Sequence, residues 1–276
     1  MWLREVISKS VNYKRRITIN GQGFLAPRIY GMSTSATEAW MLPLLKQIRR
    51  ARSGRFIDVG VNVGQTLLKV KSVDIAWDYL GLEPNPACVF YSRELARINN
   101  LNNVSIFPVG ISEVTGVYDL FLFSNSSVGS AASLIEDFKG DTKPVQNMPI
   151  ACFSFQDLPE AARLSEVSVL KIDVEGSEPA VLRSMAGKIS GDRPFIFLEV
   201  LPAYSSENEA RLVIQREIES FLSEQNYKLY RAIKTPNGQL EHLESVASIG
   251  VHSDLNRCDY ISAHTDFTRL LEDLVQ

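Results

Sequence analysis

The chain has 276 residues, of which 45% are hydrophobic and 22% charged, so it holds enough apolar side chains for a globular core. This composition excludes wholesale disorder and a fibrous repeat. The 29 basic and 32 acidic residues give a formal net charge of −3, and no segment concentrates basic residues as a nucleic-acid-binding surface would. We therefore expect no nucleic-acid partner.

The cysteines and the N-terminal residues predict where the protein resides. Cys88, Cys152 and Cys258 lie far apart and outside any Cys-x-x-Cys pair, which argues against a disulfide framework and a zinc ribbon. The N-terminus has no basic region followed by an apolar stretch, and no run of about 18 apolar residues occurs anywhere. We expect a cytoplasmic protein without a membrane span.

The first part of the chain predicts a β-rich preamble and then a helix. Residues 1–36 mix short apolar runs with glycines and Pro27, and we expect them to pack on a main domain that spans residues 37–276. From Thr37 the apolar residues recur at helical spacing, and the arginines within residues 49–52 close the helix near its negative end.

Short apolar segments and amphipathic helical segments then alternate along the chain. The apolar segments are rich in β-forming residues and end at turn signals, as buried parallel strands do. The predicted strands cover residues 55–60, 79–82, 104–109, 167–172 and 194–200, and helices are predicted after Asn85, after Ser177 and over residues 207–225.

The remaining segments complete the predicted architecture. Residues 117–123 alternate like a half-exposed antiparallel strand, and residues 124–147 read as a long loop of the kind that often forms a functional lid. Strands predicted at 227–233 and 259–263 have no helix between them, only a turn at 236–238. The pattern favours an α/β fold with a mostly parallel sheet, helices on both faces and an antiparallel C-terminal edge pair.

A glycine-containing turn follows the first of these strands. It reads Gly60-Val61-Asn62-Val63-Gly64, whereas the dinucleotide fingerprint needs Gly-x-Gly-x-x-Gly to approach a pyrophosphate. Asp58 at the strand end would repel a phosphate but suits a cationic or zwitterionic group. Glu83 lies 25 residues after Asp58, where a carboxylate can accept both ribose hydroxyls. The simpler interpretation is that both features are ordinary parts of strand-to-helix loops.

Four segments resemble the FkbM family of class I S-adenosylmethionine-dependent methyltransferases. They are Glu38-Ala39-Trp40-Met41, in which the family usually has Pro at Ala39, the turn within 56–66, Glu83-Pro84-Asn85-Pro86, and Leu170-Lys171-Ile172-Asp173-Val174-Glu175-Gly176-Ser177-Glu178. The resemblance covers about residues 37–200. It implies a Rossmann-like three-layer sandwich with a seven-stranded sheet, and methyl transfer from S-adenosylmethionine to a hydroxyl oxygen of a sugar, a glycan or a natural product.

The resemblance also implies which residues hold the cofactor. The residues that would surround its amino-acid and ribose parts are Asp58, Gly60, Asn62 and Gly64. Glu83 would hold the ribose, and Val109, Gly110 and Ile111 would lie along the adenine.

Methyl transfer requires alignment of donor and acceptor and a base that removes the acceptor proton. Asp173 and Glu175 follow one predicted strand and Glu199 ends the next, so we expect their carboxylates to converge and take the catalytic roles, with the choice of base left open. Asp173 could instead organise the cofactor loop, and Glu178 could serve only the helix dipole. Paired acids could also bind Mg²⁺, but we predict no metal.

Two other functions compete with this interpretation. An NAD(P)-dependent enzyme is disfavoured by Asn62 in the glycine turn. A catalytically silent protein that binds S-adenosylmethionine as an assembly partner would show cofactor binding without turnover. The sequence leaves the identity of the acceptor and the oligomeric state open.

Overall fold

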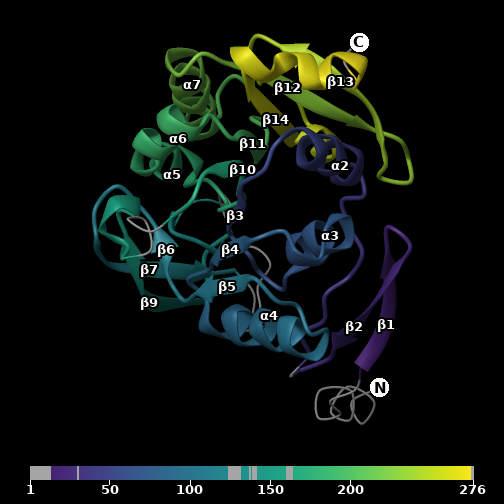
Figure 1. Cartoon of the computed structure of the whole chain (residues 1–276). Helices are drawn as coiled ribbons and strands as arrows, with labels where there is room; N and C mark the ends of the chain where they lie inside the picture. Colours follow the sequence, from purple (N-terminus) through teal and green to yellow (C-terminus); the bar gives the residue numbers. More distant parts are fainter. Residues whose placement is uncertain are drawn as a thin grey trace.

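The computed structural model describes residues 14–29, 31–123, 132–136, 138, 142–159 and 164–274. Within them the central sheet has eight strands, β3 (Arg55–Val59), β4 (Tyr79–Leu82), β5 (Val104–Phe107), β10 (Val167–Ile172), β11 (Phe195–Glu199), β12 (Tyr227–Lys234), β13 (Leu240–Val246) and β14 (Asp259–His264). Their order across the sheet is β13-β12-β14-β11-β10-β3-β4-β5 (Figure 1).

The sheet is mostly parallel, which confirms the predicted fold class. Strands β5, β4, β3, β10 and β11 run in one direction, and β14 is antiparallel to both β11 and β12. The expected count of seven strands is wrong, because residues 240–246 turn back on β12 and add an eighth strand. The two C-terminal strands predicted as the edge pair do pair with each other, but β13 covers β12 and forms the edge.

Helices cover both faces of the sheet and complete three layers. One face packs against α2 (Met41–Ala51), α3 (Gln65–Val73), α4 (Pro86–Ile98) and the 3₁₀ helix η4 (Thr265–Leu274). The other face packs against α5 (Glu178–Ser184), α6 (Ala186–Asp192) and α7 (Glu209–Glu224). Short 3₁₀ helices lie at η1 (Phe155–Asp157) and η3 (Leu255–Arg257). Within the described ranges, no helix combines the length and apolar character needed to cross a bilayer.

Local sequence signals explain where most helices begin. Asn85 caps α4, since its side-chain oxygen accepts from the backbone N–H of Ala87 at 3.0 Å, and Pro86 suits the first helical position. Helix α2 begins at Met41, four residues later than the predicted Thr37. The helix predicted after Ser177 ends at Ser184, and Gly187 lies inside the short helix α6 that follows, which the sequence analysis missed.

A second, smaller sheet stands beside the carboxyl ends of β4 and β5. Its order is β6-β9-β7-β8, with β6 (Gly110–Ile111), β7 (Gly116–Leu122), β8 (Ala132–Ser133) and β9 (Gln146–Phe153). The strand predicted at 117–123 is confirmed as β7. The long loop predicted at 124–147 is partly wrong, because β8 and the first two residues of β9 lie in it, whereas residues 134–136, 138 and 142–145 belong to no helix or strand. Residues 124–131, 137 and 139–141 lie outside the described residues.

The N-terminal hairpin packs on the helical layer. Strands β1 (Lys14–Ile19) and β2 (Gln22–Pro27) pair antiparallel, and Ile17 and Phe24 join the larger hydrophobic core. The amide of Asn20 donates to the Ser72 carbonyl at 2.9 Å, which fixes the hairpin against α3. The three cysteines are buried free thiols.

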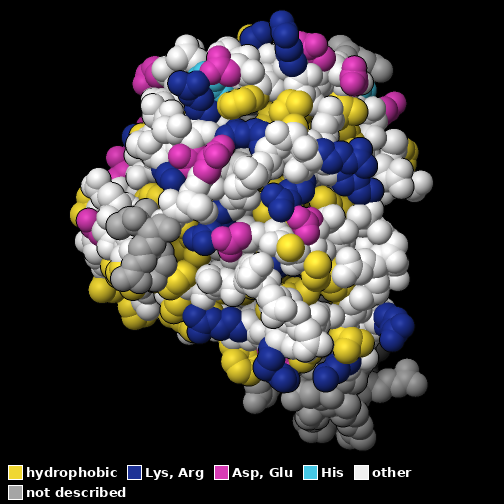
Figure 2. Space-filling view, in the orientation of Figure 1, with side chains coloured by type: hydrophobic (Ala, Val, Ile, Leu, Met, Phe, Trp, Pro, Cys, Tyr) yellow, Lys and Arg dark blue, Asp and Glu magenta, His cyan; other side chains and the backbone are white. Residues whose placement is uncertain are grey.

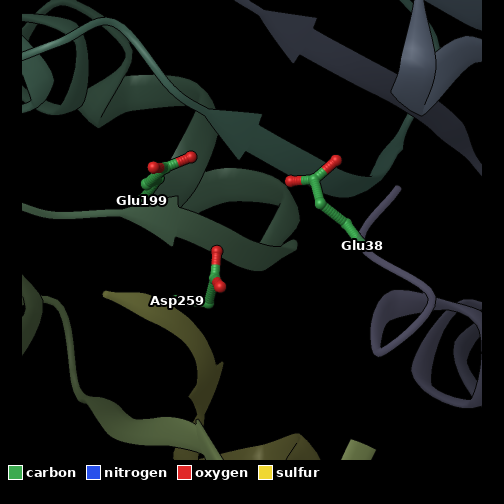
Figure 3. A group of neighbouring side chains, drawn as sticks. All are labelled: Glu38, Glu199 and Asp259. Atoms are coloured by element: carbon green, nitrogen blue, oxygen red, sulfur yellow. The ribbon is translucent and has the colours of Figure 1, made fainter. Parts of the chain in front are cut away.

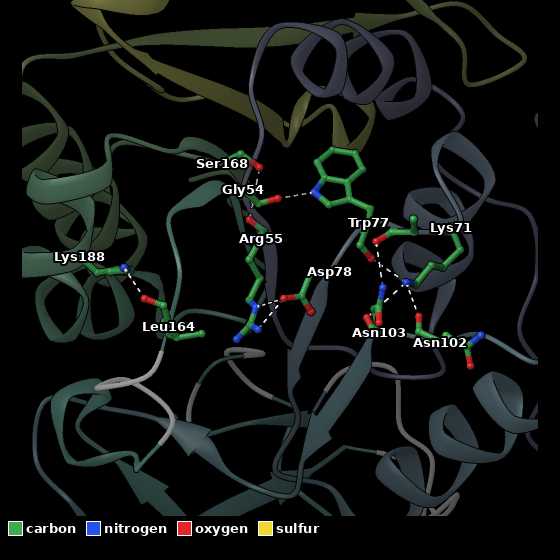
Figure 4. A network of polar contacts seen from close by, with 11 residues as sticks. Gly54, Arg55, Lys71, Trp77, Asp78, Asn102, Asn103, Leu164, Ser168 and Lys188 are labelled. Atoms are coloured by element: carbon green, nitrogen blue, oxygen red, sulfur yellow. Dashed lines mark hydrogen bonds and ion pairs between the residues drawn. The ribbon is translucent and has the colours of Figure 1, made fainter.

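A buried lysine organises the edge of the sheet opposite to the carboxyl ends. The Lys71 ammonium at the end of α3 donates to the carbonyls of Trp77 at 2.6 Å and Asn102 at 2.7 Å (Figure 4). It thereby joins the segment that enters β4 to the segment that enters β5. The Trp77 indole N–H in turn donates to the Gly54 carbonyl at 2.9 Å, ahead of β3.

Replacing Lys71 by Met should therefore lower the free energy of unfolding by about 2–4 kcal/mol, because buried carbonyls lose a charged donor. Urea denaturation of the Lys71→Met protein measures this change. Lys228→Met is the matched control, since Lys228 is exposed on β12 and its loss should change stability by less than about 0.5 kcal/mol. Equal stabilities of the two variants would contradict the role of Lys71.

Candidate active site

A pocket lies at the carboxyl ends of β3, β4 and β10, beneath the small sheet. The empty space within it, which includes open solvent, is about 730 Å³. Polar groups line one side and apolar side chains of the small sheet, among them Leu120 and Leu134, line the other. The pocket residues predicted from the sequence are Gly60, Asn62, Glu83, Gly110, Ile111, Asp173 and Glu175.

Gly60 allows the β3 loop to approach the β10 loop closely. Its φ is +93°, and a Cβ built on it would lie 1.9 Å from the backbone oxygen of Asp173, so no other residue fits without moving one of the loops. Asn62 also adopts the left-handed conformation, which asparagine tolerates better than most residues. The turn thus holds bare backbone at the floor of the pocket.

Glu83 connects the two strand-to-helix loops that flank the pocket. It is only 7% exposed, and its two carboxylate oxygens accept from the backbone N–H groups of Asn62 and Asn85, each at 2.8 Å. Burial raises the pKa of Glu83 to about 7, although these two hydrogen bonds favour the ionised form. A carboxylate in this position still has free lone pairs toward the pocket.

Beneath the pocket, a buried cation lies between two carboxylates. The Lys171 ammonium contacts Asp58 at 3.5 Å and donates to Asp173 at 3.0 Å, and the Tyr79 hydroxyl donates to Asp58. Burial raises the pKa of Asp58, and the Lys171 charge opposes that rise. Asp58 is fully buried and does not line the pocket, whereas Asp173 does.

The loop after β10 is held in shape by its own side chains. Glu178 accepts from the backbone N–H of Gly176 at 3.0 Å, and burial raises its pKa to about 7. The carbonyl of Glu175 accepts from the Ser133 hydroxyl at 2.7 Å, which ties the loop to the small sheet. Glu178 therefore stabilises the loop, and Glu175 lies on the pocket wall.

Three carboxylates meet next to Asp173 along the same edge of the sheet. The carboxylate oxygens of Glu38, Glu199 and Asp259 lie within 4.8 Å of one another (Figure 3). Lys69 pairs with Glu38 and Lys234 pairs with Asp259. The charge of Asp173, followed by burial, raises the pKa of Glu199, so Glu199 holds a proton to higher pH than an ordinary glutamate.

Several predicted residues lie outside the pocket wall. Gly64 caps the start of α3, Val109 packs on the second hydrophobic core, and Glu199 lies beside Asp173 on the next strand. Sequence reasoning missed Lys171 as the partner of both aspartates. It also missed Asp259, although Lys171 and Asp259 both belong to predicted strands.

The family model described as the methyltransferase FkbM domain matches residues 58–229, more than half of the chain. The chain belongs to the FkbM methyltransferase family. Its cofactor is therefore S-adenosylmethionine, as the resemblance implied, which favours this interpretation over the NAD(P)-dependent alternative. No protein of curated function matches the chain.

Solved structures of similar fold include other methyltransferases. Methyltransferase FkbM from Methylobacillus flagellatus KT is 15% identical with a TM-score of 0.47; the match covers 76% of this chain but 43% of that protein. A putative O-methyltransferase from Klebsiella pneumoniae is 13% identical (TM-score 0.46, 84% and 80% covered). An O-methyltransferase from Bacillus cereus in complex with SAH is 15% identical (TM-score 0.46, 83% and 81% covered).

The pocket residues fit S-adenosylmethionine. We expect the Glu83 carboxylate to accept from the ribose hydroxyls and the backbone of the glycine turn to lie against the amino-acid part, because both line the pocket. Ile111 and Leu134 offer an apolar surface for the adenine. Asp173 adds negative charge on the wall, which suits the cationic sulfonium.

Glu83→Ala should weaken S-adenosylmethionine binding by about 2–4 kcal/mol, because two charge-assisted hydrogen bonds to the ribose are lost. With the Glu83 pKa at about 7, the dissociation constant should also rise toward tenfold per pH unit as the pH falls from 7 to 5.5. Calorimetry measures both effects.

Glu83→Gln is the control for the pH effect. Glu178 titrates in the same range but remains in this variant, so the difference between the two proteins isolates Glu83. A folded Glu83→Ala protein with an unchanged dissociation constant would remove Glu83 from the ribose site.

Gly60→Val should reduce cofactor affinity by at least 100-fold or prevent folding, because its side chain would displace the Asp173 backbone. Asn62→Ala should lower the free energy of unfolding by only about 1–2 kcal/mol, because alanine adopts the left-handed conformation less readily than asparagine. Thermal melting with and without S-adenosylmethionine compares the two variants. If the Gly60→Val protein had the melting temperature and the cofactor affinity of the parent, the close approach of the β3 loop to the β10 loop would be refuted.

Proposed function

We propose that the protein transfers the methyl group of S-adenosylmethionine to a hydroxyl oxygen of a small molecule or glycan, with Asp173 as the general base. The observation that carries this proposal is the position of Asp173: it lies on the pocket wall while its other contact is the buried Lys171 ammonium. The bound cofactor supplies an electrophilic methyl group on a sulfonium.

Asp173 suits the role of a base that acts in the transition state. A hydroxyl group is too weak an acid to ionise before the reaction, so the base accepts its proton while the new C–O bond forms and the C–S bond breaks. Lys171 fixes the Asp173 carboxylate at 3.0 Å and keeps it from turning away from the pocket. The proton ends on Asp173 and then passes to solvent.

Glu199 and Glu175 take different roles in this proposal. The raised pKa of Glu199 favours its protonated form, which donates a hydrogen bond beside Asp173, over a role as a second base. Glu175 lies on the pocket wall and positions the acceptor. No metal enters the proposal, because two of the three clustered carboxylates already have a lysine partner: Lys69 pairs with Glu38 and Lys234 pairs with Asp259.

On the face shown in Figure 2, the surface charges suit a small molecule or glycan better than a nucleic acid. Figure 2 shows Lys and Arg side chains interspersed with Asp and Glu on the face in view, without a continuous basic area. Nucleic-acid binding draws most of its affinity from such an area. We further propose a cytoplasmic location, supported by three separate cysteines without disulfides.

Asp173→Asn should lower turnover about 10²-fold or more, since the amide keeps the volume but accepts no proton. It should raise the cofactor dissociation constant by a much smaller factor, because one negative charge near the sulfonium is lost. Glu199→Gln should lower turnover by about tenfold or less, because the amide replaces a carboxyl group whose raised pKa favours its neutral form. Transfer of label from methyl-labelled S-adenosylmethionine to extracts of the source measures turnover.

The same assay separates the alternatives. A parental rate in Asp173→Asn would assign the proton transfer to Glu175 or Glu199, which their glutamine variants then distinguish. Cofactor binding without label transfer to any acceptor would favour the catalytically silent partner protein instead.

A further inference from the structure

A short segment that includes β8 forms part of the apolar wall of the cofactor pocket. We call its described residues, 132–136 and Phe138, the strap. Ala132 and Leu134 line the pocket together with the polar loops that follow β3, β4 and β10. Within the described residues, the strap pairs with β7 through Ala132 and Ser133 only. Its position against the β10 loop therefore depends on a few further contacts.

Two contacts tie the strap to the loop after β10. The Ser133 hydroxyl donates to the Glu175 carbonyl at 2.7 Å. The ring of Phe138 lies directly on Gly176, since a Cβ built on Gly176 would lie 2.7 Å from two of the ring carbons. Leu134 lies between these two contacts along the chain, so they hold this part of the pocket wall from both ends.

Arg211, near the start of α7, holds Phe138 in this position. Its guanidinium carbon lies 4.0 Å from the centroid of the Phe138 ring, and its Nη2 donates to the Phe138 carbonyl at 2.6 Å. A cation–π contact and a charge-assisted hydrogen bond thus act on the same residue. Burial lowers the pKa of Arg211, and the nearby charges of Glu178 and Glu175 oppose that change. We call the contacts of Arg211, Phe138 and Gly176 the clasp.

The burial of Phe138 depends on this clasp. The ring is only 5% exposed, yet none of the three hydrophobic clusters formed by the described residues includes it. Segments with few buried apolar contacts open at low free energy, so the strap can leave the β10 loop without unfolding the core. Arg211, Phe138 and Gly176 do not line the pocket, so the clasp can form with or without a bound cofactor.

We propose that Arg211 is a positioning residue for cofactor exchange. By holding Phe138 on Gly176 it keeps the strap closed as a wall of the pocket, and S-adenosylmethionine and S-adenosylhomocysteine enter and leave while the clasp is open. Weakening the clasp raises the population of the open state in the free and the bound protein alike. Association and dissociation then become faster together, whereas loss of an ordinary ligand contact speeds dissociation alone. The inference goes beyond the proposed methyl acceptor, since it concerns the cofactor alone.

The test measures both rate constants of S-adenosylhomocysteine on the immobilised full-length protein by surface plasmon resonance. Arg211→Met removes the charge and the hydrogen-bond donor of the clasp and keeps an unbranched apolar side chain. Phe138→Ala removes the ring and leaves α7 unchanged, so it tests the clasp independently of any disturbance of that helix. Arg216→Met is the matched control, because Arg216 is an exposed arginine of the same helix that pairs with Glu209.

We expect Arg211→Met and Phe138→Ala each to raise both rate constants by about tenfold or more and to change the dissociation constant by less than about threefold. The double variant should be at most about twice as fast as the faster single variant, because both changes open the same clasp. Arg216→Met should keep the parental rates.

Three outcomes would each overturn the role of Arg211. They are parental rates in Arg211→Met, faster dissociation with unchanged association, and multiplied effects of the two changes in the double variant. None of these measurements requires a methyl acceptor, so their failure would leave the proposed hydroxyl methylation as it stands.

Discussion

The carboxyl edge of the sheet depends on one buried cation, the ammonium of Lys171. It is only 6% exposed and lies between Asp58 on β3 and Asp173 after β10. Without it, two carboxylates at adjacent strand ends would face each other across a site from which water is largely excluded, at a cost of several kcal/mol. The Gly60 turn packs directly on the Asp173 backbone, so the ion pair that holds Asp173 in place also supports the floor of the pocket.

The carboxylates along this edge differ in how nearby cations compensate their charges. Asp58 is enclosed by Tyr79 and Lys171 and takes no part in the pocket surface. Asp259 is paired with Lys234, so its charge is also compensated. Glu199 lies between these parts, and the charge of Asp173 favours its protonated form. The proposed base, Asp173, is paired with Lys171 and lies next to Glu199.

The sequence predicts the parts of the fold that are locally encoded. Strands 79–82 and 167–172 are rich in apolar residues and match β4 and β10 to the residue. Strand β13 carries polar residues on an exposed edge, and its sequence Leu-Glu-His-Leu-Glu-Ser-Val resembles a surface segment until it pairs with β12. Asp259 approaches Glu199 only because β14 inserts between β11 and β12, and no local pattern encodes that order. The sequence therefore predicts several residues of the pocket, but it does not predict the cluster of Glu38, Glu199 and Asp259 beside it.

The buried carboxyl groups of the site reduce stability at neutral pH. Glu83 and Glu178 have pKa values of about 7 and the pKa of Glu199 is also raised, so all three lie above the ordinary value for glutamate. The folded chain therefore holds more protons on these groups than the unfolded chain as the pH rises from about 4.5, and their contribution to stability falls through pH 7. A fold selected for stability alone would replace such groups with apolar side chains. Clusters of groups with perturbed pKa values are typical of functional sites, which is consistent with the proposed role of this edge.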